Sequence, residues 1–147
     1  MKRLGLLLIC VATLAMASCG LASSVSSSNT VAQASGQSCG AAVQGLYSSY
    51  KKTGTVNLAD ATNLNNALAV ASAYSGLKQN KDNQAYRKAF TSGLIASSAG
   101  LITSANATTF VDQLLAQSGL ANVNAQNIAQ TASTAVAIIT ILNALKQ

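Results

Sequence analysis

Few side chains in this chain of 147 residues could carry out covalent or acid–base chemistry. The only acids are Asp60, Asp82 and Asp112, there are three cysteines, and histidine is absent. Two carboxylates that converge can hydrolyse a glycoside, and a thiol beside an imidazole can act as a nucleophile. Without histidine, neither a Ser-His-Asp nor a Cys-His arrangement can form.

The remaining reactive groups are better explained as structural. We expect Asp82 to cap a helix and Asp60 to lie in the first turn of another helix, where an acid suits the helix dipole. Zinc would have only Cys39 and scattered aspartates as ligands, which is a poor set. The sequence contains no glycine-rich phosphate-binding pattern. We therefore predict no catalytic residue, no cofactor, no metal and no enzymatic activity. An enzyme would need at least two of Asp60, Asp82, Asp112 and Cys39 in one pocket.

A different chemistry is indicated by the first nineteen residues. Lys2-Arg3 precedes a mainly apolar run over residues 4–16, and small residues then lead to Cys19. This order is typical of an export signal. A membrane-spanning helix needs about 20 apolar residues, and the polar run from Ser18 onward stops this segment short of that length.

Met16-Ala17-Ser18-Cys19 resembles the lipobox of bacterial lipoprotein precursors, although that family most often has Leu where this chain has Met16. The resemblance implies cleavage before Cys19 and diacylation of Cys19. Acyl chains would hold the protein on a membrane, because each buried methylene contributes about 0.8 kcal/mol. In many lipoproteins of two-membrane bacteria, an Asp directly after the lipidated Cys resembles an inner-membrane retention signal. This chain has Gly20 at that position, and the absence of Asp favours the periplasmic face of the outer membrane if the organism has one.

The same segment leaves a second interpretation open. Ala15 and Ala17 also satisfy the small-x-small rule of ordinary signal peptidase, whose cleavage would release a soluble protein with a plain thiol at Cys19.

The residues that follow this segment are numerous enough for one domain. We expect a signal peptide over 1–18, the lipidated Cys19 with a flexible linker over 19–38, and a helical bundle over 39–147. The linker is rich in Ser, Ala, Asn and Gln. Residues 30–35 could extend the first helix backwards.

Apolar residues three and four positions apart predict an all-α fold, a small bundle of four to five helices after a disordered tether. We expect helices over about 38–52, from 57 to 76–80, over 82–106, over 109–117 with Thr108 or Thr109 as its cap, and from after Asn122 or Asn124 to 145. Residues 135–145 are nearly all apolar, which predicts that the last helix is the central helix of the bundle. Gly93 and Gly100 indicate either close helix packing or a division of the third helix into two.

The basic residues of the expected domain are spread along it, at Lys51, Lys52, Lys78, Lys81, Arg87, Lys88 and Lys146. Nucleic-acid binding would need a denser basic patch with stacking aromatics, so we predict no nucleic-acid partner. Attraction to anionic lipid headgroups or to a cell-wall polymer is one use for this charge, and solubility is the other. Cys39 is expected to be a small buried helix residue, and the tyrosines to lie at the edges of the core. Amides such as Asn63 could bind glycans if they are exposed.

The function expected from these observations is that of a lipid-anchored cell-envelope protein with a non-catalytic binding or structural role. Its partners would be the membrane, through the N-terminal lipid, and an envelope protein or the cell wall. The alternative is a soluble secreted helical protein that binds a small apolar ligand or a partner helix between its helices.

Overall fold

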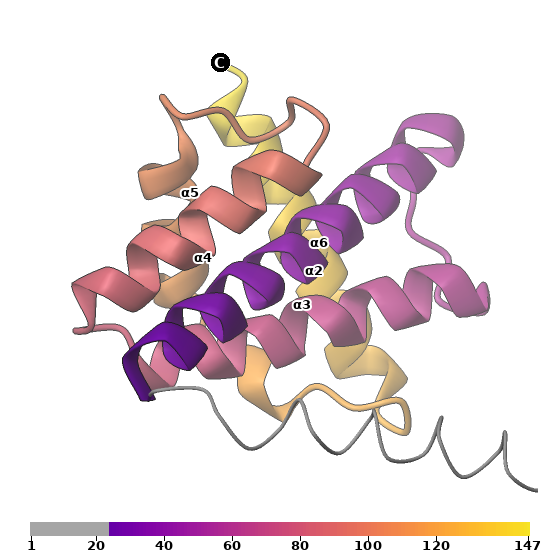
Figure 1. Ribbon diagram of the computed structural model, residues 1–147. Helices are drawn as coiled ribbons and strands as arrows, with labels where there is room; N and C mark the ends of the chain where they lie inside the picture. Colours follow the sequence, from indigo (N-terminus) through magenta and orange to yellow (C-terminus); the bar gives the residue numbers. More distant parts are fainter. Residues whose placement is uncertain (1–23) are drawn as a thin grey trace, which may run out of the picture.

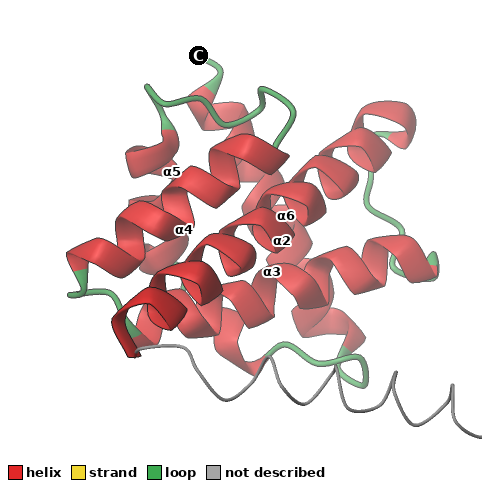
Figure 2. Cartoon of the chain, in the orientation of Figure 1, coloured by secondary structure: helices red, strands yellow, loops and turns green. Residues whose placement is uncertain are grey.

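Helices account for nearly all the regular structure of residues 24–147, the part of the chain that the computed structural model describes (Figure 1). No strand occurs among these residues (Figure 2). The helices are α2 (Ser24–Thr53), α3 (Ala61–Gln79), α4 (Gln84–Ser97), α5 (Ala107–Ala116), the 3₁₀ helix η1 (Leu120–Asn122) and α6 (Ile128–Leu145). The predicted all-α helical bundle is therefore confirmed.

The expected boundary between linker and domain is wrong. Helix α2 begins at Ser24, so much of the segment expected to be a flexible linker is helical. Ala32 is fully buried and Gly36 packs against α4. The small polar side chains of this segment resemble those of a linker, but they also allow a second helix to approach closely. The signal peptide, Cys19 and the start of the expected linker lie outside the described residues.

The centre of the bundle is α2, which packs most extensively against α4 and then against α3. The prediction that the last helix is central is wrong, because α6 contacts several helices less extensively and exposes Ile128 and Val136. Among the described residues, α6 is the one helix long and apolar enough to span a membrane, with 39% of its residues buried in the bundle.

Close packing between α2 and α4 depends on three glycines. A Cβ atom added at Gly36 would lie 2.0 Å from the Phe90 carbonyl oxygen, and one added at Gly93 would lie 2.1 Å from the Gln33 carbonyl oxygen. At Gly40 the corresponding distance to the Leu94 oxygen is 2.6 Å. Both helices therefore approach to backbone contact, which no residue with a side chain would permit at these positions.

Gly100 marks the end of a helix and not a packing contact. The expected third helix stops at Ser97, and Ala99 and Gly100 follow with φ angles of 50° and 81°. A left-handed backbone cannot continue a right-handed helix. The Ser98 hydroxyl accepts a hydrogen bond from the Ile102 amide at 3.2 Å and keeps Ile102 buried in the turn. The expected helix over 82–106 is therefore a shorter helix followed by a loop.

The helix caps also differ from expectation. The cap of α4 is Asn83, whose side chain accepts a hydrogen bond from the Tyr86 amide at 3.1 Å, and Asp82 is exposed beside it. Asp60 is the cap of α3 and accepts from the Thr62 amide at 2.8 Å. Asn is as good a cap as Asp, so the sequence alone did not distinguish these neighbours.

The last two α-helices also begin after an asparagine, although the Asn106 side chain does not cap α5. Helix α5 begins at Ala107 after Asn106, so the expected caps Thr108 and Thr109 are wrong. Helix α6 begins at Ile128, where Asn127 accepts from the Gln130 amide at 3.1 Å.

Gly36→Ala is expected to lower the free energy of unfolding by about 2 kcal/mol, measured by urea titration. Overpacking lowers stability by about 1–3 kcal/mol, and by more where the clash is with backbone atoms. The higher helix propensity of Ala than of Gly offsets about 1 kcal/mol of this loss. Gly45→Ala is the matched control in the same helix, because its nearest atoms belong to the Asn66 side chain, which can move. Equal stability of Gly36→Ala and the wild type would contradict the proposed contact.

Asn83→Ala is expected to destabilise the bundle by about 1 kcal/mol, because it removes the cap of α4. The neighbouring substitution Asp82→Ala should leave the free energy of unfolding within about 0.5 kcal/mol of the wild type. Chemical denaturation of both variants tests the assignment, and a larger loss for Asp82→Ala would reverse it.

Candidate functional site

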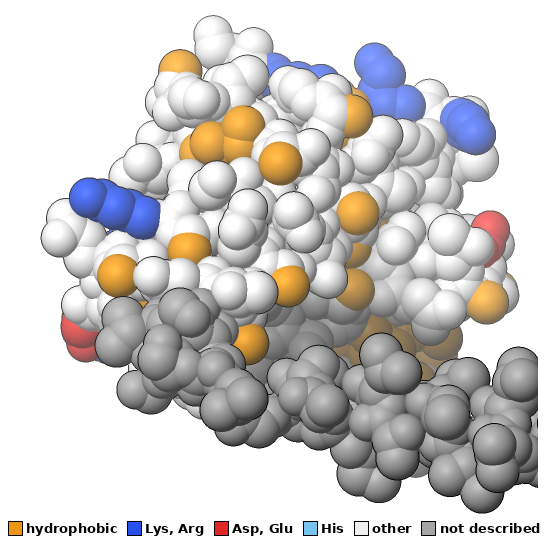
Figure 3. Space-filling view, in the orientation of Figure 1, with side chains coloured by type: hydrophobic (Ala, Val, Ile, Leu, Met, Phe, Trp, Pro, Cys, Tyr) orange, Lys and Arg blue, Asp and Glu red, His pale blue; other side chains and the backbone are white. Residues whose placement is uncertain are grey.

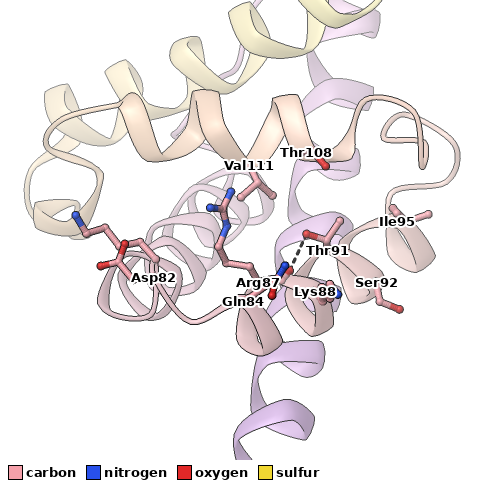
Figure 4. Close-up of a pocket in the computed structure, with 10 residues that line it drawn as sticks. Asp82, Gln84, Arg87, Lys88, Thr91, Ser92, Ile95, Thr108 and Val111 are labelled. Carbon is pink, nitrogen blue, oxygen red and sulfur yellow. Dashed lines mark hydrogen bonds between the residues drawn. The ribbon is translucent and has the colours of Figure 1, made fainter.

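A groove between α4 and α5 has a volume of about 730 Å³ (Figure 4). Most of its lining comes from the turn before α4 and from one face of α4, and α5 supplies the opposite wall (Figure 4). The lining residues are Lys81, Asp82, Gln84, Arg87, Lys88, Thr91, Ser92, Ile95, Thr108 and Val111.

Charge at the groove is mostly positive. The Arg87 guanidinium contacts the Asp112 carboxylate at 2.6 Å, the only ion pair among the described residues, and it links α4 to α5. The two side chains are 34% and 59% exposed. Solvent therefore screens the pair, and it contributes at most about 1 kcal/mol to stability. Lys81 and Lys88 are exposed at the rim, with Asp82 as the nearby acid.

The other lining groups offer hydrogen bonds and apolar surface. The Thr91 hydroxyl donates to the Arg87 carbonyl at 2.7 Å, which engages it within its own helix (Figure 4). Ile95 and Val111 supply aliphatic surface from opposite walls. This combination suits noncovalent binding of an anionic or polar group with a modest apolar portion.

Of Cys39 and the three aspartates that the sequence singled out, only Asp82 lines the groove. Cys39 is buried in the core, and Asp60 caps the start of α3. Asp82 follows the end of that 19-residue helix, so about 28 Å of helix separates the two acids. Asp112 pairs with Arg87. The described residues hold no group of three or more His, Cys, Asp or Glu side chains that could bind a metal ion.

Cys39 is the small buried helix residue that the sequence predicts. It lies in α2 with no exposed surface, packed in the hydrophobic core. Burial raises the pKa of the thiol from 9.0 to about 12, because the thiolate would lose its hydration. The protonated form therefore dominates at neutral pH and the thiol is a poor nucleophile.

The tyrosines lie deeper than expected, because Tyr47, Tyr74 and Tyr86 are buried in the core and only Tyr50 is half-buried at its edge. The Tyr74 ring is buried and its hydroxyl donates to the Gln117 carbonyl at 2.9 Å. The Lys146 ammonium donates to the Tyr47 hydroxyl at 2.9 Å and lies 4.1 Å from the centre of its ring. The hydrogen bond and the positive charge of Lys146 lower the pKa of Tyr47. The sequence did not predict this contact between residues 99 positions apart.

Asn63 is not one of the exposed amides that the sequence suggested. Its side chain is buried and donates to the Asn57 carbonyl at 2.9 Å and to the Ser49 hydroxyl at 3.0 Å. It therefore holds the turn between α2 and α3 and is not available to a glycan.

Basic side chains do not form one broad patch on the face that Figure 3 presents. They gather at opposite edges of this face, and the surface between them is largely uncharged (Figure 3).

Comparisons of the chain with protein-family models, with curated proteins and with solved structures found no match.

Cys39 is expected to resist alkylation in the folded protein. We would use residues 19–147 carrying Cys19→Ser, so that Cys39 is the one thiol. At pH 8 a pKa of about 12 gives a thiolate fraction about a thousandfold below that of an exposed cysteine. Iodoacetamide labelling followed by mass spectrometry should be slow until urea unfolds the chain.

The matched control moves the thiol two positions along α2, to the exposed site of Ala41. In a Cys39→Ala background, Ala41→Cys should react rapidly without urea. Rapid labelling of Cys39 in the folded protein would contradict its burial.

The pKa of the Cys39 thiol is higher in the folded chain than in the unfolded chain. The protonated thiol therefore stabilises the fold fully below pH 9, and this contribution is lost between pH 9 and about 12.

Proposed function

We propose that this protein is a lipid-anchored component of the bacterial cell envelope with a non-catalytic binding or structural role. The observation that carries the proposal is the sequence Met16-Ala17-Ser18-Cys19 behind a basic start and a short apolar run. Cys19 would carry the lipid, and the helical bundle would be held at the membrane by it. The compartment that follows is the periplasmic face of the outer membrane, where the organism has one.

A binding role is supported by the groove between α4 and α5. Its rim carries Lys81, Arg87 and Lys88, and Ile95 and Val111 are the hydrophobic side chains among its lining residues. A lining of this kind favours an anionic ligand over a wholly apolar one. It therefore supports an envelope component over the alternative of a secreted carrier for a small apolar molecule.

Cys19→Ala is expected to abolish both metabolic labelling with a fatty acid and recovery of the protein in the membrane fraction. Without the sulfur no acyl chain can be attached, and no other lipid anchor is proposed. Bacteria would be labelled with an alkyne fatty acid, fractionated, and analysed by gel fluorescence and immunoblotting.

Cys39→Ala is the matched control, since it removes a buried thiol and should keep both the label and the membrane association. A wild-type protein that is unlabelled and recovered in the soluble fraction would refute the anchoring and favour ordinary cleavage after Ala17. A Cys19→Ala protein that stays labelled would show that the lipid is elsewhere.

A further inference from the structure

We propose that one end of the bundle, which we call the basic end, docks on the anionic headgroups of the membrane that holds the lipid anchor. The basic residues of this end are Lys78, Lys81, Arg87 and Lys88. This inference rests on the proposed function, because it takes Cys19 to be the lipid-bearing residue.

The length of chain between Cys19 and α2 limits which part of the bundle can reach the membrane. Only residues 20–23 separate Cys19 from Ser24, where α2 begins. A fully extended chain over these five steps spans at most about 18 Å. Helix α2 has 30 residues and is therefore about 45 Å long. The start of α2 must lie close to the membrane, and its far end need not.

Packing places the basic end beside the start of α2. Helix α4 runs parallel to α2, because Gly36 faces Phe90 and Gly40 faces Ser97. The first turn of α4 therefore lies beside the early turns of α2.

Helix α3 runs antiparallel to α2, because Asn63 near its start bonds to Ser49 near the end of α2. Its last turn, which carries Lys78, consequently approaches the start of α2. Figure 1 shows the turn between α3 and α4, which carries Lys81, at the same end of the bundle as the start of α2.

Electrostatics favour contact of this end with an anionic surface. Its four basic residues stand against Asp82 and Asp112, and Asp112 is already paired with Arg87. Lys78, Lys81 and Lys88 are exposed. A lysine close to an anionic membrane strengthens binding about fivefold, and this effect fades beyond a Debye length of about 10 Å. The lipid and the basic end would thus both contribute to membrane binding.

Charge alone would not select this end. The opposite end carries Lys51, Lys52 and Lys146 against Asp60, so its excess of basic residues is similar. Lys146 is in addition bound to the Tyr47 hydroxyl. The short connection to Cys19 is what distinguishes the two ends, and Lys51 and Lys52 therefore provide an internal control.

The test measures which end of the lipidated protein touches the bilayer. Ala85→Cys and Ala59→Cys place a thiol at exposed positions near the starts of α4 and α3, at the basic end and the opposite end respectively. A thiol-reactive environment-sensitive fluorophore would report on each site, because buried Cys39 does not compete for it. The lipidated full mature protein would be reconstituted in vesicles containing 30% phosphatidylglycerol in phosphatidylcholine, with a headgroup nitroxide lipid as quencher.

We expect the probe at residue 85 to be quenched at least threefold more strongly than the probe at residue 59. Lys81→Gln with Lys88→Gln should reduce this difference, whereas Lys51→Gln with Lys52→Gln should leave it unchanged. The difference in quenching should also decrease in vesicles of phosphatidylcholine alone and in 1 M salt, as it does in the Lys81→Gln, Lys88→Gln variant.

Equal quenching at the two sites, or stronger quenching at residue 59, would overturn the inference. If the probe at residue 85 is preferentially quenched to the same extent in anionic vesicles, in neutral vesicles and in 1 M salt, contact with anionic headgroups is refuted. The short connection to Cys19 would then be the whole cause of the preference. Mass spectrometry of the same preparations reports the acyl chains on Cys19. Lipidated protein with equal quenching therefore refutes the docked end alone, whereas protein without acyl chains refutes the proposed function and this inference with it.

Discussion

The close approach of α2 and α4 is the constraint on which the rest of this bundle depends. Gly36, Gly40 and Gly93 bring two helix backbones into contact, and residues from both helices then complete one core. The described part of the chain has few large side chains with which to fill a wider space. Small residues offset that shortage, because van der Waals contact between backbones replaces contact between bulky side chains.

Polar side chains in the interior are compatible with this packing because each has a partner. Asn63, Ser98, Thr131 and Thr134 are buried. Among the described residues, no buried side-chain nitrogen or oxygen lacks a hydrogen bond. Thr134 donates to the Gln130 carbonyl of α6, and Thr131 donates to the carbonyls of Asn127, the cap of α6, and of Asn124, both at 2.9 Å. A chain rich in Ser, Thr and Asn can therefore build a core without the full cost of burying unpaired polar groups.

Periodicity in the sequence predicted the fold class and the existence of each helix, because both follow from local spacing. Burial of Cys39 was also predictable, since a thiol without a nearby histidine packs as a small hydrophobic side chain. The depth of the tyrosines was not, because Tyr74 is buried with a hydrogen-bond partner 43 positions away in the sequence. Helix starts were less predictable, because Asp82 and Asn83 can both cap and only three-dimensional geometry selects between them. The groove depends on residues of two helices, such as Ile95 of α4 and Val111 of α5, that line its opposite walls. No local pattern encodes such an arrangement.

The misjudged linker changes the functional argument most. A flexible segment of about 19 residues would have a typical end-to-end distance near 25 Å and a much longer reach. Such a tether would let any face of the bundle meet the membrane. Helix α2 instead begins five positions after Cys19. The attached domain would then have one end held near the bilayer, and the groove between α4 and α5 extends from that end along α4, since its lining runs from Lys81 to Ile95. Polar composition favours a linker, but Ala32 is buried in the core and Gly36 packs against α4. These contacts stabilise the segment as part of a helix.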